Sequence, residues 1–406
     1  MKGSEQQNDK AGERIGVMKT NKKVWAVIAL GVLMAVLAAC GGNGNASDSA
    51  GSASPSASPS GSAGASPSAE ASASASASAG NAGIDWEARI AANKEAGEIN
   101  FMTSFNYSAS LANVNAWVAD ELGYFEELGL DVKVQPGLDA DGMKLLAAGQ
   151  LQFAHAGSGS VVVQAVANGA DIKGISVMAP VGLGALMVLE DSGIDDVKDL
   201  EGKTVGYKGA MGANFLAMFK NGGADASKIK QVSVGFDPTI LNTADVDAIT
   251  VFKSNEPATM ERQGFKVKLL YPEDYGINTS FGVMVANGDF AAEHPTAAED
   301  FLRAIMKAHE WILANPEETI ELLEAKSGGN FDLAVETNRL KVETELAASN
   351  KHEGQGLGWF TPEQWQAEID ILNDAGVLAQ SVSVDQVADS RYVSAIYDGE
   401  RLIWPE

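Results

Sequence analysis

The stretch of residues 99–135 constrains the fold of this chain most strongly. It opens with a short apolar run, residues 99–103, which is typical of a buried strand. A helix is expected over residues 111–125, because its apolar positions recur every three to four residues. Gly129 ends this helix, and residues 130–134 alternate as a second strand. Strand, helix and strand of this length form a βαβ unit, so the strands are expected to be parallel with a right-handed crossover.

A ligand-binding loop is expected directly after the first of these strands. Parallel sheets bind ligands in the crevice at the carboxyl ends of their strands. Residues 104–108 follow the strand at that edge and contain polar and aromatic side chains. The βαβ unit therefore predicts that Ser104, Asn106 and Tyr107 face a ligand.

Strands and helices alternate through the rest of the globular part, which predicts an α/β fold. Two apolar runs without helical periodicity, 185–189 and 281–286, bracket a complete module of strands and helices. We interpret these runs as two crossover strands that connect two lobes about a hinge. The expected first lobe is 97–182 plus 280–406, and the expected second lobe is 183–279.

The C-terminal part of the chain is expected to be helical and to brace the first lobe. Thr296 and Glu299 have the spacing of a capping box at the start of one long helix. Thr361 followed by Pro362 predicts the start of another helix, because proline is favoured in a first helical turn.

A targeting segment precedes the fold, and residues 1–39 are predicted to be a signal peptide. Its basic region begins at Met18, so a start at Met18 is an alternative to a start at Met1. The apolar run of residues 24–39 is shorter than the roughly 20 residues that a membrane-spanning helix needs. Small residues before Cys40 resemble a bacterial lipobox, with Cys40 as the lipidated residue. An uncleaved membrane anchor is the alternative interpretation.

The segment after Cys40 is predicted to be a flexible tether, over residues 40–83. It consists almost wholly of Ser, Ala, Gly and Pro, and such a composition cannot form a core. About 40 residues of this kind have an r.m.s. span on the order of 35 Å, which keeps a globular domain near a membrane. Because Cys40 is the sole cysteine, disulfides within the chain and thiolate metal clusters are excluded.

The composition and motifs argue against several classes of function. A formal net charge of −25 opposes binding to nucleic acid. The four histidines are scattered without metal-ligand spacing, and no GxSxG sequence is present. The triplet at residues 202–204 lacks the upstream glycine of a P-loop. We therefore expect neither a catalytic site nor a metal or other cofactor.

The sequence LGYFEELGLDV at residues 122–132 resembles a signature of solute-binding proteins of ABC importers. The family is the one that serves nitrate, alkanesulfonates or taurine, and thiamine-pyrimidine precursors. DLEGKTVGY at residues 199–207 and DVDAI at 245–249 extend the resemblance over nearly all of the chain after residue 97. It implies a two-lobed, periplasmic-binding-protein-like (type II) fold whose lobes close on a ligand. It also implies an extracytoplasmic, lipid-anchored monomer whose partners are an ABC permease and its ATPase.

The predicted ligand-binding residues lie in loops at the expected cleft, where helix starts offer N–H groups and aromatic rings can stack on a ligand. Ordinary glycine turns are the alternative for the glycine-rich loops. For Glu256 the resemblance implies a polar position that contacts ligand. The predicted residues are Ser104, Asn106, Tyr107, Ser158, Gly159, Ser160, Gly209, Met211, Gly212, Ala213, Phe252, Glu256 and Tyr275, with Phe105 as a further aromatic candidate.

Three alternatives for the function stay open at this stage. The cleft loops contain no arginine, and Lys208 and Lys253 are the basic residues nearby, which favours a planar, largely neutral heterocycle over a nitrate or sulfonate anion. Residues 274–276 resemble the thiamine-pyrimidine branch of the family, but the first loop lacks the histidine that this branch has. An enzyme that makes thiamine pyrimidine is disfavoured, because its cysteine-rich run is absent. A receptor for a membrane sensor is the third alternative.

The lipobox gives a first testable prediction. Cys40→Ala removes the thiol that the lipid would modify, so the variant is expected to be released from membranes or to accumulate unprocessed. Fractionation of cells that express both forms checks this. A Cys40→Ala protein that is cleaved normally and stays in the membrane fraction would show that Cys40 is not the anchor.

Overall fold

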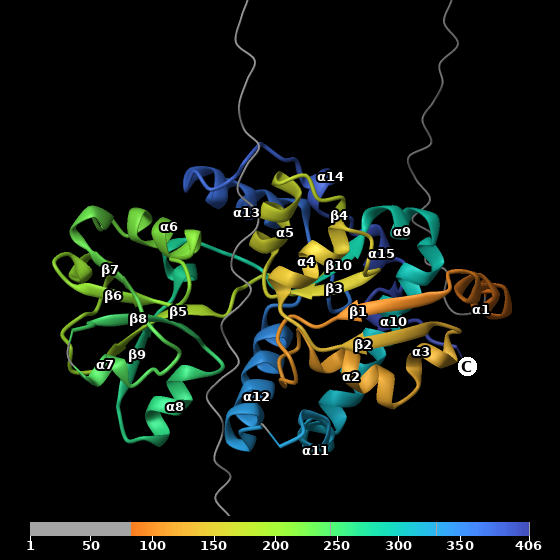
Figure 1. The fold of residues 1–406 in the computed structure, drawn as a ribbon, viewed down its shortest axis with the longest axis horizontal. Helices are drawn as coiled ribbons and strands as arrows, with labels where there is room; N and C mark the ends of the chain where they lie inside the picture. The colour runs from red at the N-terminus through yellow and green to blue at the C-terminus, as the bar shows by residue number, and fades with distance from the viewer. Residues whose placement is uncertain (1–82, 244, 330, 406) are drawn as a thin grey trace, which may run out of the picture. The chain divides into compact units, whose positions relative to one another are not determined.

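The computed structural model describes residues 83–405 except 244 and 330, and these form the ribbon of Figure 1. The predicted signal peptide, Cys40 and nearly all of the predicted tether lie outside the described residues. Among the residues that are described, no helix is both long enough and apolar enough to cross a bilayer.

The first sheet has five strands in the order β2-β1-β3-β10-β4. β1 pairs in parallel with β2 and β3, which confirms the predicted βαβ unit, whereas β10 is antiparallel to both β3 and β4. The bounds of these strands are β1 Glu98–Met102, β2 Asp131–Gln135, β3 Phe153–Ala156, β4 Ile172–Ala179 and β10 Phe281–Asn287.

The second sheet also has five strands, in the order β7-β6-β8-β5-β9. β6 pairs in parallel with β7 and β8, and β5 is antiparallel to both β8 and β9. The bounds are β5 Gly184–Leu189, β6 Thr204–Tyr207, β7 Lys230–Ser233, β8 Ala248–Phe252 and β9 Val267–Leu270. The two predicted crossover strands are thus β5 and β10, each antiparallel within its sheet. This confirms the α/β fold with two mixed sheets, while the lobe boundaries themselves stay predictions.

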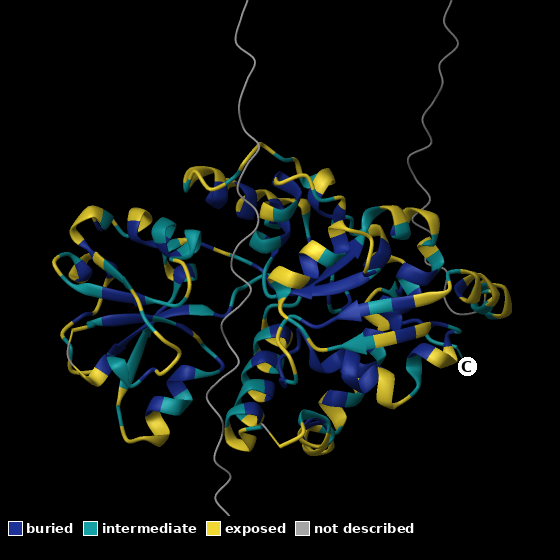
Figure 2. Ribbon diagram, viewed as in Figure 1, coloured by how far each residue is buried: buried dark blue, intermediate teal, exposed yellow. Residues whose placement is uncertain are grey.

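Helices cover both sheets (Figure 1). Each sheet packs against its own helices through a cluster of buried apolar side chains. Figure 2 shows that β3, β4, β5 and β10 are mostly buried. The rings of Phe153 and Phe301 stack with centroids 4.2 Å apart, which joins the first sheet to α10. The helices are α1 Trp86–Glu95, α2 Val114–Glu121, α3 Tyr124–Glu127, α4 Asp139–Ala147, α5 Gly159–Ala167, α6 Ala213–Asn221, α7 Ile240–Thr243, α8 Glu256–Arg262, α9 Gly288–Glu293, α10 Pro295–Ala314, α11 Pro316–Ser327, α12 Leu333–Ser349, α13 Pro362–Asp374, α14 Val384–Val387 and α15 Arg391–Ser394.

Two helix predictions were wrong in detail. The expected single helix over residues 111–125 is divided into α2 and α3, because Gly123 has a φ of 73° that interrupts the helix. The Thr296 capping box does not form, since α10 already begins at Pro295. Glu299 instead accepts a hydrogen bond from the Arg89 side chain at 2.8 Å. The predicted start of α13 is confirmed, because the Thr361 hydroxyl accepts from the N–H of Gln364 at 3.2 Å.

A buried polar network attaches α1 to α10. Asp300 Oδ1 accepts from Arg89 Nη2 at 2.8 Å and from Arg303 Nε at 2.9 Å. Asp300 Oδ2 accepts from the Asn93 amide at 2.7 Å, and Asn93, Asp300 and Arg303 are all fully buried. Arg303 Nη1 also donates to the carbonyl of Ile403 at 2.5 Å. The first helix and the end of the chain are therefore both held by α10.

Removal of the Asp300 carboxylate is expected to destabilise this part of the fold strongly. Asp300→Ala leaves the Arg303 guanidinium buried without its counter-charge, and the expected loss in free energy of unfolding is about 3–5 kcal/mol. Urea unfolding measures it. Glu299→Ala is the matched control, because Glu299 also binds Arg89 but is partly exposed. Equal losses of unfolding free energy in the two variants would show that the buried Asp300 carboxylate is no more important than the partly exposed Glu299 carboxylate.

Candidate ligand-binding site

The loop after β1 is organised by one buried amide, the side chain of Asn113. Its Oδ1 accepts from the Ser104 N–H at 2.8 Å, from the Ser104 hydroxyl at 3.0 Å and from the Phe105 N–H at 3.2 Å. Asn106 has a φ of 34° and is alone among the described non-glycine residues in having a positive φ, a conformation that asparagine tolerates better than most residues. The Phe105 side chain is 51% exposed on this fixed backbone.

Tyr107, the predicted stacking residue of this loop, packs against its own lobe. Its ring lies 4.8 Å from that of Trp117, with an angle of 31° between the planes. Tyr107 is half-buried against the core of the first sheet, and Trp117 is buried. Tyr107 therefore packs beneath the loop, whereas the Phe105 side chain is exposed to solvent.

The loop after β8 is fixed in a similar way by Glu256, at the start of α8. Glu256 Oε2 accepts from the Phe252 N–H at 2.8 Å, and Oε1 forms an ion pair with Lys208 Nζ. Glu256 is buried, whereas the Phe252 side chain is 54% exposed. The Lys208 ammonium lies 5.7 Å from the centre of the Phe252 ring. Burial lowers the pKa of Lys208 to about 8, although the neighbouring carboxylate favours its charged form.

The loops after β1 and β8 meet at one carboxylate, that of Glu343 on α12. Glu343 Oε2 accepts from the Leu111 N–H at 2.9 Å, and Oε1 accepts from the Ser254 hydroxyl at 2.8 Å. The Asn338 amide, also on α12, donates to the Ser254 carbonyl at 3.0 Å. The chain segments that follow β1 and β8 thus converge on α12. Figure 1 shows this helix between the two sheets.

The turn after β3 forms the start of α5, and it hydrogen-bonds to the buried side chain of Glu368 on α13. The Ser160 hydroxyl donates to Glu368 Oε2 at 2.5 Å, and the Ser280 N–H donates to Glu368 Oε1 at 2.5 Å. The Gly159 N–H donates to the Ser280 hydroxyl at 2.8 Å. The Ser158 side chain makes no capping hydrogen bond. Burial raises the pKa of Glu368, and the hydrogen bonds from Ser160 and Ser280 oppose that rise.

The turn after β6 leads from Lys208 into α6. Gly209 has a φ of 68°, a left-handed conformation that suits glycine. Gly212 caps α6 without a side-chain hydrogen bond, and the first turn of α6 contains no acidic residue. Met211, Gly212 and Ala213 are half-buried. The predicted residues of this turn therefore lie at a helix start that has no side-chain cap and that closely follows Lys208, the partner of Glu256.

Tyr275 is not brought together with the other predicted residues. Its hydroxyl donates to Asp196 Oδ2 at 3.2 Å and accepts from the Val197 N–H at 3.3 Å. Its carbonyl accepts from the amide of Asn221, the last residue of α6, at 3.0 Å. Gly212 caps the opposite end of this helix, roughly 13 Å away at 1.5 Å per residue. Tyr275 thus packs on the far end of α6, and we leave it out of the candidate site.

Asn113, Glu343 and Glu368 were missed by the sequence analysis. Asn113 carries a local signal, because asparagine is favoured at the start of a helix. Glu343 and Glu368 carry none, since their partners lie far away in sequence: Leu111 is 232 residues from Glu343, and Ser160 is 208 residues from Glu368.

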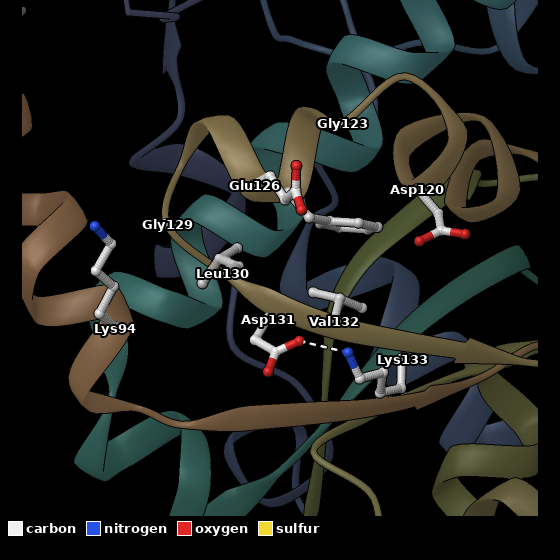
Figure 3. A pocket seen from close by; sticks show the side chains of 10 residues that line it. Lys94, Asp120, Gly123, Glu126, Gly129, Leu130, Asp131, Val132 and Lys133 are labelled. Atoms are coloured by element: carbon white, nitrogen blue, oxygen red, sulfur yellow. Dashed lines mark hydrogen bonds and ion pairs between the residues drawn. The ribbon is translucent and has the colours of Figure 1, made fainter.

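A separate pocket of about 420 Å³ lies at the start of β2 (Figure 3). Lys94, Glu126 and Leu130 are among its lining residues. Asp131 and Lys133 also line it, and they form an ion pair 2.6 Å long. This is the amino end of a parallel strand, opposite to the edge where such sheets bind ligands. We therefore place the candidate site at the loops after β1, β3, β6 and β8. No group of three metal-ligating side chains occurs in the part of the chain that the structure describes.

The model of the family described as NMT1/THI5 like matches residues 113–319. The chain belongs to this family. The formylaminopyrimidine-binding protein of Halalkalibacterium halodurans is 28% identical over 283 residues, which cover 68% of this chain and 84% of that protein. The riboflavin-binding protein RibY of Chloroflexus aurantiacus is 24% identical over 302 residues, or 71% and 85% of the two chains.

Enzymes also match this chain. The 4-amino-5-hydroxymethyl-2-methylpyrimidine phosphate synthase of Schizosaccharomyces pombe is 25% identical over 240 residues, covering 55% of this chain and 67% of the synthase. Among solved structures, the periplasmic aliphatic sulphonate binding protein SsuA of Escherichia coli aligns with a TM-score of 0.55 at 16% identity, covering 71% and 91% of the two chains. These findings confirm the predicted family and the predicted periplasmic-binding-protein fold.

The contact at Glu343 should make stability depend on pH. Burial raises the pKa of Glu343 to about 7 from a usual value of 4.5. Between these values the unfolded chain has lost a proton that the folded protein keeps, so stability falls as pH rises, by up to about 3 kcal/mol. Glu343→Gln should make this fall shallower than in wild type, as measured by urea unfolding between pH 4.5 and 8.

Glu345→Gln is the control for that measurement, because Glu345 is an exposed carboxylate of the same helix. It should keep the slope of the wild-type protein. Parallel stability curves for wild type and Glu343→Gln over this range would contradict the assigned role of Glu343.

Proposed function

We propose that this protein is an extracytoplasmic solute-binding protein that captures a small molecule between its two lobes for an ABC importer. Membership of the NMT1/THI5-like family supports the proposal, as do the names of the two binding proteins that it resembles over most of their length. A lipid on Cys40 would keep the protein near a permease and its ATPase. Closure of the lobes about the hinge would enclose the ligand.

Two exposed phenylalanine rings carry this proposal. Phe105 follows β1 and Phe252 ends β8, and about half of each side chain is exposed. Each has its backbone N–H fixed by a buried side chain, Asn113 in one lobe and Glu256 in the other. A large apolar ring that is held exposed at a sheet's carboxyl edge indicates a binding surface, because a ligand can cover it.

The ligand that fits these groups best is a planar, largely neutral heterocycle. Rings stack well on phenylalanine, and Asn106, Ser158 and the start of α6 offer hydrogen bonds for the edge of a heterocycle. Lys208 adds a cation whose pKa is lowered toward neutrality. We assign Tyr107 and Glu256 to positioning, because the first packs on Trp117 and the second holds Phe252 and Lys208.

The other candidate functions have less support. The loops of residues 104–113, 157–160, 208–213 and 252–257 contain no arginine, so a bidentate clamp for a sulfonate or nitrate anion is missing from them. A synthase activity is disfavoured because the cysteine-rich run that the resemblance implies for such enzymes is absent, with Cys40 as the sole cysteine. A receptor that passes its ligand to a membrane sensor would use the same cleft and differ only in its partner.

Phe252→Ala should weaken binding of a heterocycle by about 2- to 13-fold, because aromatic stacking contributes roughly 0.5–1.5 kcal/mol. Calorimetry with a formylaminopyrimidine and with riboflavin measures it, and Phe105→Ala should act in the same direction. Leu313→Ala is the matched control, because Leu313 is also 54% exposed but lies on α10. Tight binding of methanesulfonate by wild type, without binding of either heterocycle, would overturn the proposed ligand class.

A further inference from the structure

The side-chain amide of Asn214 finds no hydrogen-bond partner among the residues that the structure describes. Asn214 is the second residue of α6, which begins at Ala213 after the glycine-rich turn that follows β6. The residue is half-buried, so its amide has lost part of its contact with water. Polar groups in such places are normally hydrogen-bonded. The amide is therefore a group that a ligand can satisfy.

Two glycines define where this amide lies. An ideal Cβ atom at Gly184, the first residue of β5, would lie 3.3 Å from Asn214 Nδ2. A Cβ atom at Gly212 would clash with Asn214 Oδ1, so the amide oxygen lies against the Gly212 backbone. Gly184 is half-buried, whereas the next four residues of β5 are buried. The amide thus lies where β5 emerges from the core of the second sheet.

The exposed ring of Phe252 belongs to the same face of this sheet. Gly184 and Phe252 are directly opposite each other in the antiparallel pairing of β5 with β8. The Cβ positions of such a pair point to one face and lie about 4.5–5.5 Å apart. The Cβ position of Gly184 therefore has Phe252 on one side and the Asn214 amide on the other. Because Lys208 Nζ lies 5.7 Å from the centre of the Phe252 ring, a ring, an amide and an ammonium group come together here.

A free amide selects one kind of ligand edge. It offers a donor and an acceptor side by side, so it fits an edge that carries an acceptor next to a donor. Asparagine binds adenine in this bidentate way, through a ring nitrogen and the neighbouring amino group. Sulfonate and nitrate offer acceptors alone, so they would leave the amide oxygen unpaired. The amide therefore favours an amino-substituted nitrogen heterocycle.

We propose that Asn214 is a specificity-determining residue, which binds the edge of a heterocycle that stacks on Phe252. Its Nδ2 donates to a ring nitrogen of the ligand, and its Oδ1 accepts from the neighbouring amino group. The missing side chain at Gly184 leaves room for this edge between the ring and the amide. This inference rests on the proposed function, since it names the edge by which the proposed ligand is recognised.

The test is the loss of a preference between two compounds, measured by isothermal titration. The first is a formylaminopyrimidine with a ring amino group, and the second is its analogue with hydrogen in place of that amino group. Wild type should bind the first about 5-fold more tightly, because the second lacks one hydrogen bond. Asn214→Ala should bind both with Kd values equal to within about 2-fold. Asn221→Ala is the matched control, because it removes an amide from the opposite end of α6 and should keep the wild-type ratio.

A wild-type preference that persists in Asn214→Ala would overturn the inference, because a purely structural role would weaken both compounds alike. Equal Kd values of wild type for the two compounds would also overturn it. If Asn214→Ala does not fold, Asn214→Leu replaces it, because leucine has a similar shape and no hydrogen-bonding group, and the same outcomes decide.

Riboflavin is titrated in parallel, so that failure of the inference can be told from failure of the proposed function. Wild type that binds riboflavin and neither pyrimidine would keep the proposed function and overturn the role of Asn214. Wild type that binds none of the three compounds would count against the proposed ligand class, and with it against this inference.

Discussion

The candidate site depends on the buried carboxylate of Glu343, which accepts hydrogen bonds from the chain that leaves each sheet. Leu111 follows β1 and Ser254 follows β8, and both donate to this one side chain. Burying a carboxylate without hydrogen-bond donors costs much free energy. The folded protein is therefore stable only when Leu111 and Ser254 both donate to Glu343. The loops of the two lobes are held in one place because α12 supplies an acceptor that each of them needs.

The same principle operates within each lobe. Asn113 and Glu256 are buried polar side chains whose oxygens accept backbone N–H groups, and a phenylalanine is exposed directly beside each acceptor. Hydrogen bonding inside the protein thus fixes the backbone, which holds the exposed ring in a defined position without packing it away. At α5 a third buried acceptor, Glu368, engages the helix start itself. Buried polar groups therefore fix the backbone or the helix start at three loops of the candidate site.

Much of the fold could be predicted from local patterns. The strand at residues 99–103, the crossover strands β5 and β10 and the start of α13 at Thr361 depend on apolar periodicity, proline and capping residues that lie close in sequence. The two errors arose where one local signal overrode another. Gly123 interrupted an otherwise periodic helix, and α10 began at Pro295, so Thr296 lies inside the helix and does not cap it. Of the predicted site residues, Tyr107 and Glu256 lie at the expected loops but have their polar or aromatic groups engaged within the protein.

The sequence by itself determined that this chain is an α/β protein, where the strands β1, β2, β5 and β10 begin and end to within one residue, and which loops follow the carboxyl ends of parallel strands. It could not determine which side chains of those loops are free to meet a ligand. That was decided by tertiary contacts between residues more than 200 positions apart, such as Ser160 with Glu368 and Leu111 with Glu343. The physical reason is that periodicity records which face of an element is buried, whereas the partner of a buried carboxylate is known only once distant segments have packed.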